Sequence, residues 1–511
     1  MAPEAGPVEA LVVVGDRIAA LGSAELLRAF PGSVVHDLGG RTLCPGFIDA
    51  HHHLSISALH PRWADLRTVS SDEELASVLE AQAEREPSTP WIRAAGWSDV
   101  GSGFVPHRRH LDTLGLDRPV LVAHYSLHQA VTDSKGLALL GIGASTPDPP
   151  GGSIGRYPDG TPSGLLIERA WSEAHRRSLA PYEDPDRLAE HIETAARALL
   201  CQGITAVHDT ACSPAAERAY RSLAERGRLS ISVMTCPHPS ALFAPPQEVR
   251  LLEGPRTGEG DEWLRTGPVK LFADGGVAPA IDVHLQGQRL TLGSIFGGLT
   301  EQVELAISRG YRVAVHAIGN AGLEEALHAF VAAAGRHPGD DHRFRVEHAC
   351  LASPAQLRRL SELGGVAVVQ PAFLDHLGRQ IEGVVFDDAQ WLPFAAIRQA
   401  GVTLAASSDC PCAFSEPLLG SGLGVTRRAG SGAVIDEGQS VPMLDWLEAY
   451  TVGAAYAGGQ EHERGSLEVG KRADLVVLDG ALAPEPPPTV VQTWVAGRLV
   501  FGAELPRLEP S

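Results

Sequence analysis

The sequence predicts an α/β fold: a (β/α)8, TIM-like barrel with a small β-sandwich domain formed by both chain termini and an insertion after the first barrel strand. From about residue 200 onward, short apolar runs rich in Val, Ile, Leu and Ala alternate with helical segments. This alternation is typical of buried parallel strands joined by crossover helices. The two chain ends instead carry short alternating strands with glycine turns, which favours a separate sandwich.

Eight apolar runs of strand length support the barrel, because eight alternating β/α units favour a closed ring over an open doubly wound sheet. The first run is LCPGFID at residues 43–49. The other seven occupy residues 204–208, 229–235, 268–273, 311–317, 343–348, 365–370 and 402–409. The segments between them are long enough for helices, and in AGLEEALHAFVAAAGR at 321–336 apolar side chains fall on one face.

The spacing of the runs predicts the domain organisation. Roughly 150 residues separate the first two strands, which is too long for a loop, so we expect an inserted subdomain at about residues 60–180. The barrel with its insert would span residues 44–459, and residues 1–43 and 460–511 would together form the sandwich.

The net charge and the cysteine content narrow the expected binding partners and the expected cellular compartment. The chain has 511 residues and a formal net charge of -20, which argues against nucleic acid or an anionic membrane as a partner. Its 7 scattered cysteines favour a reducing cytosol over a disulfide framework. No secretory signal is visible, and no apolar run reaches the ~18 residues of a membrane span. We expect a cytoplasmic protein; its oligomeric state is left open, with a homodimer among the alternatives.

The stretch GFIDAHHHL at residues 46–54 puts three histidines directly behind the first strand. Because side chains alternate along an extended chain, His51 and His53 point the same way and His52 the opposite way. Two imidazoles on one side can share a cation, although a polar turn is the alternative reading.

Three other predicted strands end in residues of the same kind, namely His316, His348 and Asp409. Each alone is more often a packed core histidine or a helix-capping aspartate. In a barrel, however, the carboxyl ends of the strands meet at one mouth, where the chemistry sits. Four such strand ends therefore favour a metal site over chance. His208 and Asp209, at the end of the second strand, are ambiguous and could orient a ligand imidazole.

Lys270 lies inside the apolar fourth strand, where a lysine costs free energy unless it is paired. One reading pairs it with a carboxylate such as Asp274. The other lowers its pKa enough for reaction with carbon dioxide, which gives a carbamate (N6-carboxylysine) able to bridge two metals.

These features together resemble the amidohydrolase superfamily of metal-dependent hydrolases. The resemblance rests on PGFIDAHHHL, on His316, His348 and Asp409, and on GSLEVGKRADLVVLD at 465–479. Further stretches are similar to its amidohydrolase family 3 branch, which includes N-substituted formamide deformylase: GGSIGRYPDGTPSG (151–164), VKLFADGG (269–276) and SSDCPCAFSEPLLGSGLGVTR (407–427). The similarity covers nearly the whole chain.

The resemblance implies one or two divalent cations, with Zn²⁺ as the default and Mn²⁺ or Fe²⁺ as alternatives. The implied ligands are His51, His53, Lys270, His316, His348 and Asp409. In a two-metal site carboxylated Lys270 would bridge the ions; in a one-metal site it would stay a lysine, and a histidine would serve the oxyanion. Asp409, His348 and Lys270 are the implied catalytic residues, with Asp409 moving the proton of the attacking water to the departing amine.

The expected reaction is hydrolysis of an amide or N-formyl C–N bond in a small molecule by a metal-activated water. Cyclic amide hydrolysis or deamination on the same scaffold is the alternative, followed by a non-catalytic barrel relative, which would have lost ligands. Candidates for the pocket wall, for each of which ordinary packing is the other reading, are Trp97, Tyr125, His128, Gln370 and Phe373.

Overall fold

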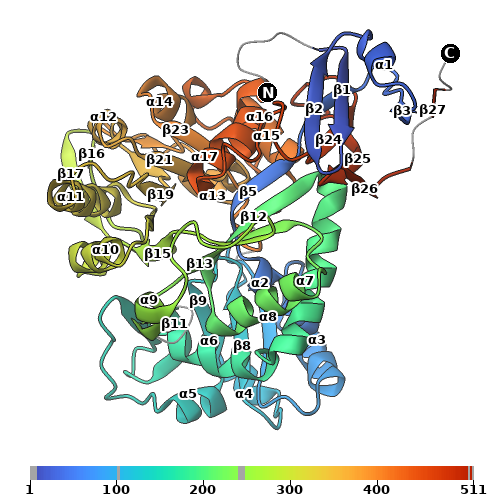
Figure 1. Ribbon diagram of the computed structural model, residues 1–511. Coiled ribbons are helices and arrows are strands. Elements are labelled where there is room, and N and C mark those ends of the chain that lie inside the picture. Colours follow the sequence, from blue (N-terminus) through green and yellow to red (C-terminus); the bar gives the residue numbers. More distant parts are fainter. Residues whose placement is uncertain (1–7, 101–103, 240–247, 504–506, 509–511) are drawn as a thin grey trace.

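The structure is a computed structural model that describes residues 8–100, 104–239, 248–503 and 507–508. In Figure 1 the strands from the two chain ends lie at one end of the molecule, the inserted sheet lies at the other, and the barrel strands run between them. No helix within the described ranges combines the length and the apolar character that crossing a bilayer requires.

The eight predicted barrel strands all form, in two parallel sheets. The first sheet has the order β14 (Leu264–Thr266), β13 (Ser232–Pro237), β12 (Ile204–Cys212) and β5 (Phe47–His52). The second has the order β15 (Val269–Phe272), β18 (Val313–Ala317), β19 (Arg345–His348), β21 (Val366–Val369) and β23 (Thr403–Ala406). Alternation with helices makes this a TIM-barrel-like α/β fold, as predicted.

The ring is not closed by a continuous ladder within the described residues, which corrects the expectation of a closed barrel. The fourth barrel strand is broken at Gly267 and Pro268, so β14 pairs with β13 while β15 pairs with β18. Proline has no backbone N–H to donate, which interrupts the ladder there. The two sheets also meet at a second seam, between β5 and β23, where individual backbone hydrogen bonds replace a ladder. Asp409 N–H donates to His51 C=O at 2.8 Å, and His53 N–H donates to Cys410 C=O at 2.9 Å.

Helices between the barrel strands show the expected local signals. α12 (Pro354–Glu362) begins with a capping box in which Ser353 and Gln356 bond reciprocally, and Pro354 takes the first helical turn. In α11 (Asn320–Arg336) the predicted apolar face is fully buried at Leu323 and Phe330. The other helices near the barrel include α7 (Pro185–Leu199), α8 (Pro214–Glu225), α10 (Leu299–Ser308), α13 (Phe373–Ile381), α14 (Phe394–Gln399), α15 (Pro417–Thr426), α16 (Met443–Glu448) and α17 (Ala454–Gly458).

The insertion after the first barrel strand forms its own mixed sheet. Its strand order is β10 (Gly152–Arg156), β11 (Pro162–Glu168), β9 (Gln129–Thr132), β8 (Val120–His124), β7 (Ile92–Trp97) and β6 (Ala64–Asp65). Its helices are α3 (Asp72–Arg85), α4 (Arg108–Thr113), α5 (Ser134–Leu140) and α6 (Ser172–Leu179). Leu75, Leu79, Val120 and Val122 belong to a hydrophobic cluster within this segment, which gives the insert a core of its own.

Both chain ends contribute to one small set of antiparallel strands, as predicted. A four-stranded sheet has the order β26 (Arg498–Phe501), β25 (Thr489–Val495), β24 (Leu475–Asp479) and β4 (Thr42–Pro45). The ribbon of β1 (Ala10–Val14) and β2 (Arg17–Gly22) packs against it through Ile18, Ala473 and Leu475. The residue boundaries of the domains, 43/44 and 459/460, stay a prediction.

Candidate metal centre

The six candidate ligands come from five barrel strands and the turns that follow them, and all are buried. His51 lies near the end of β5, and His53 caps the short helix α2 (Leu54–Ser57) that follows. The others are Lys270 in β15, His316 in β18, His348 at the end of β19 and Asp409 just after β23. Strands separated widely in sequence thus contribute imidazole, amine and carboxylate groups to one mouth.

Side-chain contacts link all six residues. Ligand atoms of His51, His348 and Asp409 lie within 4.8 Å of one another. Asp409 Oδ1 lies 3.3 Å from His51 Nε2 and 3.0 Å from His53 Nε2, and Lys270 Nζ lies 3.4 Å from His51 Nε2. The ring centroid of His316 is 4.6 Å from that of His348. The structure therefore brings the predicted set together.

His51 uses its Nδ1 for a hydrogen bond on the side of the ring that faces away from this cluster. His51 Nδ1 lies 2.6 Å from Glu347 Oε2. Burial opposes ionisation of Glu347, but the Arg345 guanidinium and the His51 N–H outweigh burial and hold the pKa of Glu347 well below its usual value. Because Glu347 is an ionised acceptor, Nδ1 carries the proton and Nε2 faces the cluster.

A hydrogen bond likewise fixes the orientation and tautomer of the His53 imidazole. Its Nδ1 lies 2.8 Å from the carbonyl oxygen of Thr210, which can only accept a hydrogen bond. Nδ1 therefore carries the proton, and Nε2 is the nitrogen directed at Asp409.

A short polar relay fixes His348. Ser407 Oγ donates to the Val369 carbonyl at 3.1 Å and accepts from Gln370 Nε2 at 2.9 Å. This orients the Gln370 amide so that Oε1 accepts from His348 Nδ1 at 2.9 Å. Burial lowers the pKa of His348 well below its usual value, so the ring is neutral and its Nε2 has a free lone pair.

Two buried atoms in the cluster lack hydrogen bonds among the described residues. These are His316 Nε2 and Asp409 Oδ1. Burial raises the pKa of Asp409, but positive charge at the adjacent His51 and His53 outweighs burial and holds the pKa well below the usual value, so the group is a carboxylate. With both rings protonated on Nδ1, a bound cation is what would supply that charge. Lone pairs facing a carboxylate oxygen repel one another unless a cation lies between them, and imidazole with carboxylate is a donor set that suits zinc. The residues fit a divalent cation.

Lys270 has the environment of a reactive lysine. Burial lowers its pKa to about 8, although the carboxylates of Glu347 and Asp409 oppose the shift. Asp274, the alternative partner, accepts hydrogen bonds from the backbone N–H groups of Ala280, Ile318 and Gly319 at 2.9–3.0 Å. Across the described ranges no ion pair joins it to Lys270.

Two candidates for the pocket wall contact the histidines of the cluster directly. The Phe373 ring stacks on His348, with centroids 5.9 Å apart and planes 11° apart. The His128 ring lies 5.2 Å from that of His316, and its Nδ1 is 2.6 Å from Glu168.

The other three wall candidates have different surroundings. Gln370 lies behind His348, as described above. Tyr125 packs between His124 and His376, with centroid distances of 4.3 and 5.2 Å. Trp97 belongs to the core of the insert, where its indole N–H donates to the Phe104 carbonyl at 2.8 Å.

The sequence interpretation missed Arg345 and Glu347, although a signal existed. RFRVEH has two charged residues two positions apart in a strand that is otherwise apolar, and residues at this spacing share a face. His208, read as ambiguous, lies 3.1 Å from Arg345 through its Nδ1.

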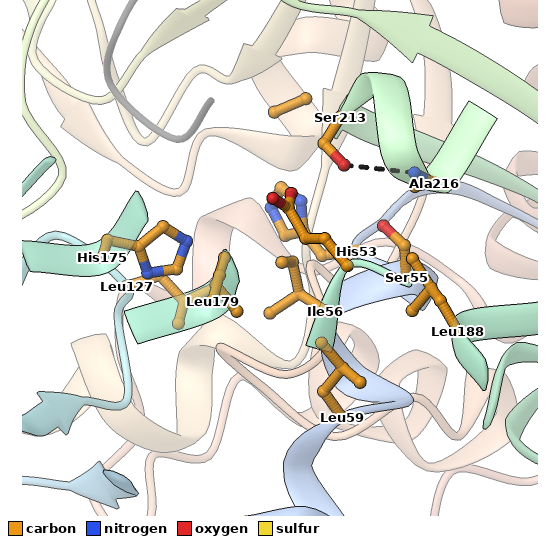
Figure 2. A pocket seen from close by; sticks show the side chains of 12 residues that line it. His53, Ser55, Ile56, Leu59, Leu127, His175, Leu179, Leu188, Ser213 and Ala216 are labelled. Carbon is orange, nitrogen blue, oxygen red and sulfur yellow. Dashed lines mark hydrogen bonds between the residues drawn. The ribbon is translucent and has the colours of Figure 1, made fainter. Parts of the chain in front are cut away.

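A small cavity of about 30 Å³ lies beside His53. Figure 2 shows the side chains that line it. Ile56, Leu59, Leu179 and Leu188 form its apolar wall, and His175 faces His53 across it. A cavity of this size has room for a water molecule.

Comparison with known proteins identifies the family. The chain matches the Amidohydrolase family over residues 34–501. It belongs to the amidohydrolase family. The N-substituted formamide deformylase of Arthrobacter pascens is 31% identical over 487 residues, covering 92% of this chain and 90% of the relative.

Solved structures agree with this assignment. An uncharacterized metal-dependent hydrolase from Pyrococcus horikoshii OT3 has a TM-score of 0.72 at 25% identity, covering 93% of this chain and 95% of the other. A second, from Pyrococcus furiosus, has a TM-score of 0.67 at 26% identity, covering 92% and 95%. The predicted family and fold are confirmed, and this amidohydrolase is a metal-dependent hydrolase of carbon–nitrogen bonds.

Proposed function

We propose that this amidohydrolase cleaves the C–N bond of a linear amide or N-formyl compound of low molecular weight at the cluster of His51, His53, His348 and Asp409. The observation that carries the proposal is the convergence of imidazole Nε2 atoms on Asp409 Oδ1. A divalent cation held by these atoms would lower the pKa of water to about 7 and polarise the scissile carbonyl.

Asp409 moves the proton in this proposal. Its carboxylate is ionised and buried beside the imidazoles, so it can accept a proton as the water oxygen attacks the carbonyl carbon. It then returns that proton to the amine nitrogen as the C–N bond breaks. The amine leaves poorly unless it is protonated, so both halves of this transfer are needed.

Neighbouring side chains orient the substrate. Burial lowers the pKa of His316 well below its usual value, so its ring is neutral, and its Nε2 is available as a ligand in a two-metal site or as a contact to the substrate oxygen in a one-metal site. Phe373 lies against His348 and His128 against His316, and we propose that these rings help to exclude water from the cluster.

Zinc is the proposed metal, because three imidazoles and a carboxylate suit it. Lys270 is proposed to be carboxylated. With a pKa of about 8, a fraction of roughly a tenth is the neutral amine at pH 7. That amine adds to carbon dioxide, forming a carbamate and releasing one proton.

The proposed substrate class rests on the similarity to N-substituted formamide deformylase. Cyclic amide hydrolysis and deamination share the same ligands, so only a substrate screen separates them. We propose that the enzyme is cytoplasmic and binds neither nucleic acid nor membrane. Its oligomeric state is left open, with a homodimer as one alternative.

The experiment is metal analysis of the purified protein together with an amine-release assay over N-formyl, N-acyl and cyclic amides. The proposal expects zinc in the protein and release of amine from linear amides. If the protein turns over only cyclic amides or ring amines, the proposed linear-amide hydrolysis is refuted and the alternative reaction is supported.

A further inference from the structure

Arg345 spans the interior of the barrel. Its side chain is almost completely buried and lies on β19 of the second sheet. Its guanidinium donates to the Ala50 carbonyl of β5 at 2.8 Å and lies 3.1 Å from His208 Nδ1 of β12. Both of those strands belong to the first sheet. One side chain therefore connects the two sheets that no continuous ladder joins within the described residues.

The same guanidinium holds Glu347. Arg345 Nε donates to Glu347 Oε1 at 2.8 Å, and a terminal nitrogen reaches Oε2 at 3.2 Å. Oε2 is also the acceptor for His51 Nδ1 at 2.6 Å. Arg345 thus fixes the Glu347 carboxylate within the second sheet, and that carboxylate orients the His51 imidazole of the first sheet.

We propose that Arg345 and Glu347 are positioning residues that set the orientation and tautomer of His51 across the gap between the two sheets, and thereby set the affinity of the centre for its metal. Neither residue faces the substrate in this proposal. The inference rests on the proposed metal centre, because His51 matters here as a ligand.

The physical reason is twofold. A carboxylate that accepts from Nδ1 fixes the ring plane and makes the opposite nitrogen a better donor to a metal, and loss of such a partner typically costs about 10–100-fold in metal affinity. In addition, Glu347 is the carboxylate that pairs with the Arg345 guanidinium among the described residues, so its loss leaves a buried charge that destabilises the barrel interior.

The test measures zinc affinity rather than turnover. Metal-free wild-type protein, Glu347→Gln and Glu347→Asp are titrated with zinc in the presence of a competing chelator. Glu347→Gln keeps the shape of the side chain but removes its charge, and its zinc affinity should fall about 10–100-fold. Glu347→Asp keeps the charge but shortens the reach, so its zinc affinity should fall less.

Val346→Ala is the matched control. Val346 lies between the two residues on β19, is fully buried, and points to the opposite side of the strand. It should lower the thermal unfolding temperature without changing zinc affinity, which separates positioning from general destabilisation.

The outcomes are distinguishable. Zinc affinity in Glu347→Gln within twofold of the wild type would overturn the inference while leaving the metal centre intact. If that variant does not fold, Glu347→Asp decides, and an unchanged affinity there overturns the inference. A wild-type protein that binds no zinc would instead refute the proposed function.

Discussion

Nε2 of His53, which follows the first barrel strand, lies 3.0 Å from Oδ1 of Asp409, which follows the last. The two residues meet at the seam where β5 and β23 come together, and backbone hydrogen bonds between Asp409 and His51 and between His53 and Cys410 fix their spacing. The seam of the barrel and the candidate metal centre are therefore built by the same residues.

Asp409→Asn should leave the fold unchanged and lower kcat at least tenfold. The amide is the same size as the carboxylate but cannot accept the water proton, and positioned proton transfer contributes about 10²–10⁴-fold. Steady-state amine release and a circular dichroism spectrum check this. An Asp409→Asn protein with more than a tenth of wild-type activity would refute the proton-transfer role.

The lowered pKa of the buried Lys270 amine predicts that the stability of the metal-free protein depends on pH in a specific way. Its pKa falls from 10.5 to about 8 on folding, so the unfolded chain binds more protons between those two values. Stability therefore rises with pH across this window, by about 3 kcal/mol for this group.

Comparison with Lys270→Met isolates that contribution. The unfolding free energy of the wild type minus that of the variant, measured by urea denaturation in buffer depleted of carbon dioxide, should increase from pH 8 to pH 10.5. A difference that is constant over this range would show that Lys270 does not titrate as a buried amine.

Gly276→Ala tests whether His128 lies on the substrate side of the centre. A Cβ at Gly276 would lie 2.4 Å from Cδ2 of His128, so the His128 ring must shift from its place beside His316. We expect KM to rise severalfold while zinc affinity stays the same.

Gly335→Ala in α11 is the control for that substitution, since nothing lies within 4 Å of its added Cβ. It should leave KM unchanged and stabilise the helix by up to about 1 kcal/mol. A lower zinc affinity in Gly276→Ala would instead make His128 part of the metal site.

Much of the fold was predictable because its signals are local. Apolar runs such as those around His316 and His348 have strand length and buried composition, and the strand-end rule of barrels then brings their last residues together. The six candidate ligands could be named from this rule and from the resemblance to the family.

The remainder depends on contacts between distant segments. The break at Gly267 and Pro268 divides one strand between two sheets, and only the pairing of β14 with β13 and of β15 with β18 reveals it. Gln370, predicted as pocket wall, lies behind His348 because Ser407 of a neighbouring segment orients its amide. Glu347 was missed because its importance depends on His51 from the opposite sheet.

The most direct test of the central claim is the metal content of the purified protein, measured by mass spectrometry alongside that of a His53→Ala, Asp409→Ala double variant. We predict one or two equivalents of zinc in the wild type, little in the double variant, and loss of amine release on chelation that zinc or manganese restores. A wild-type protein that contains no metal and gains no activity from either ion would contradict the account.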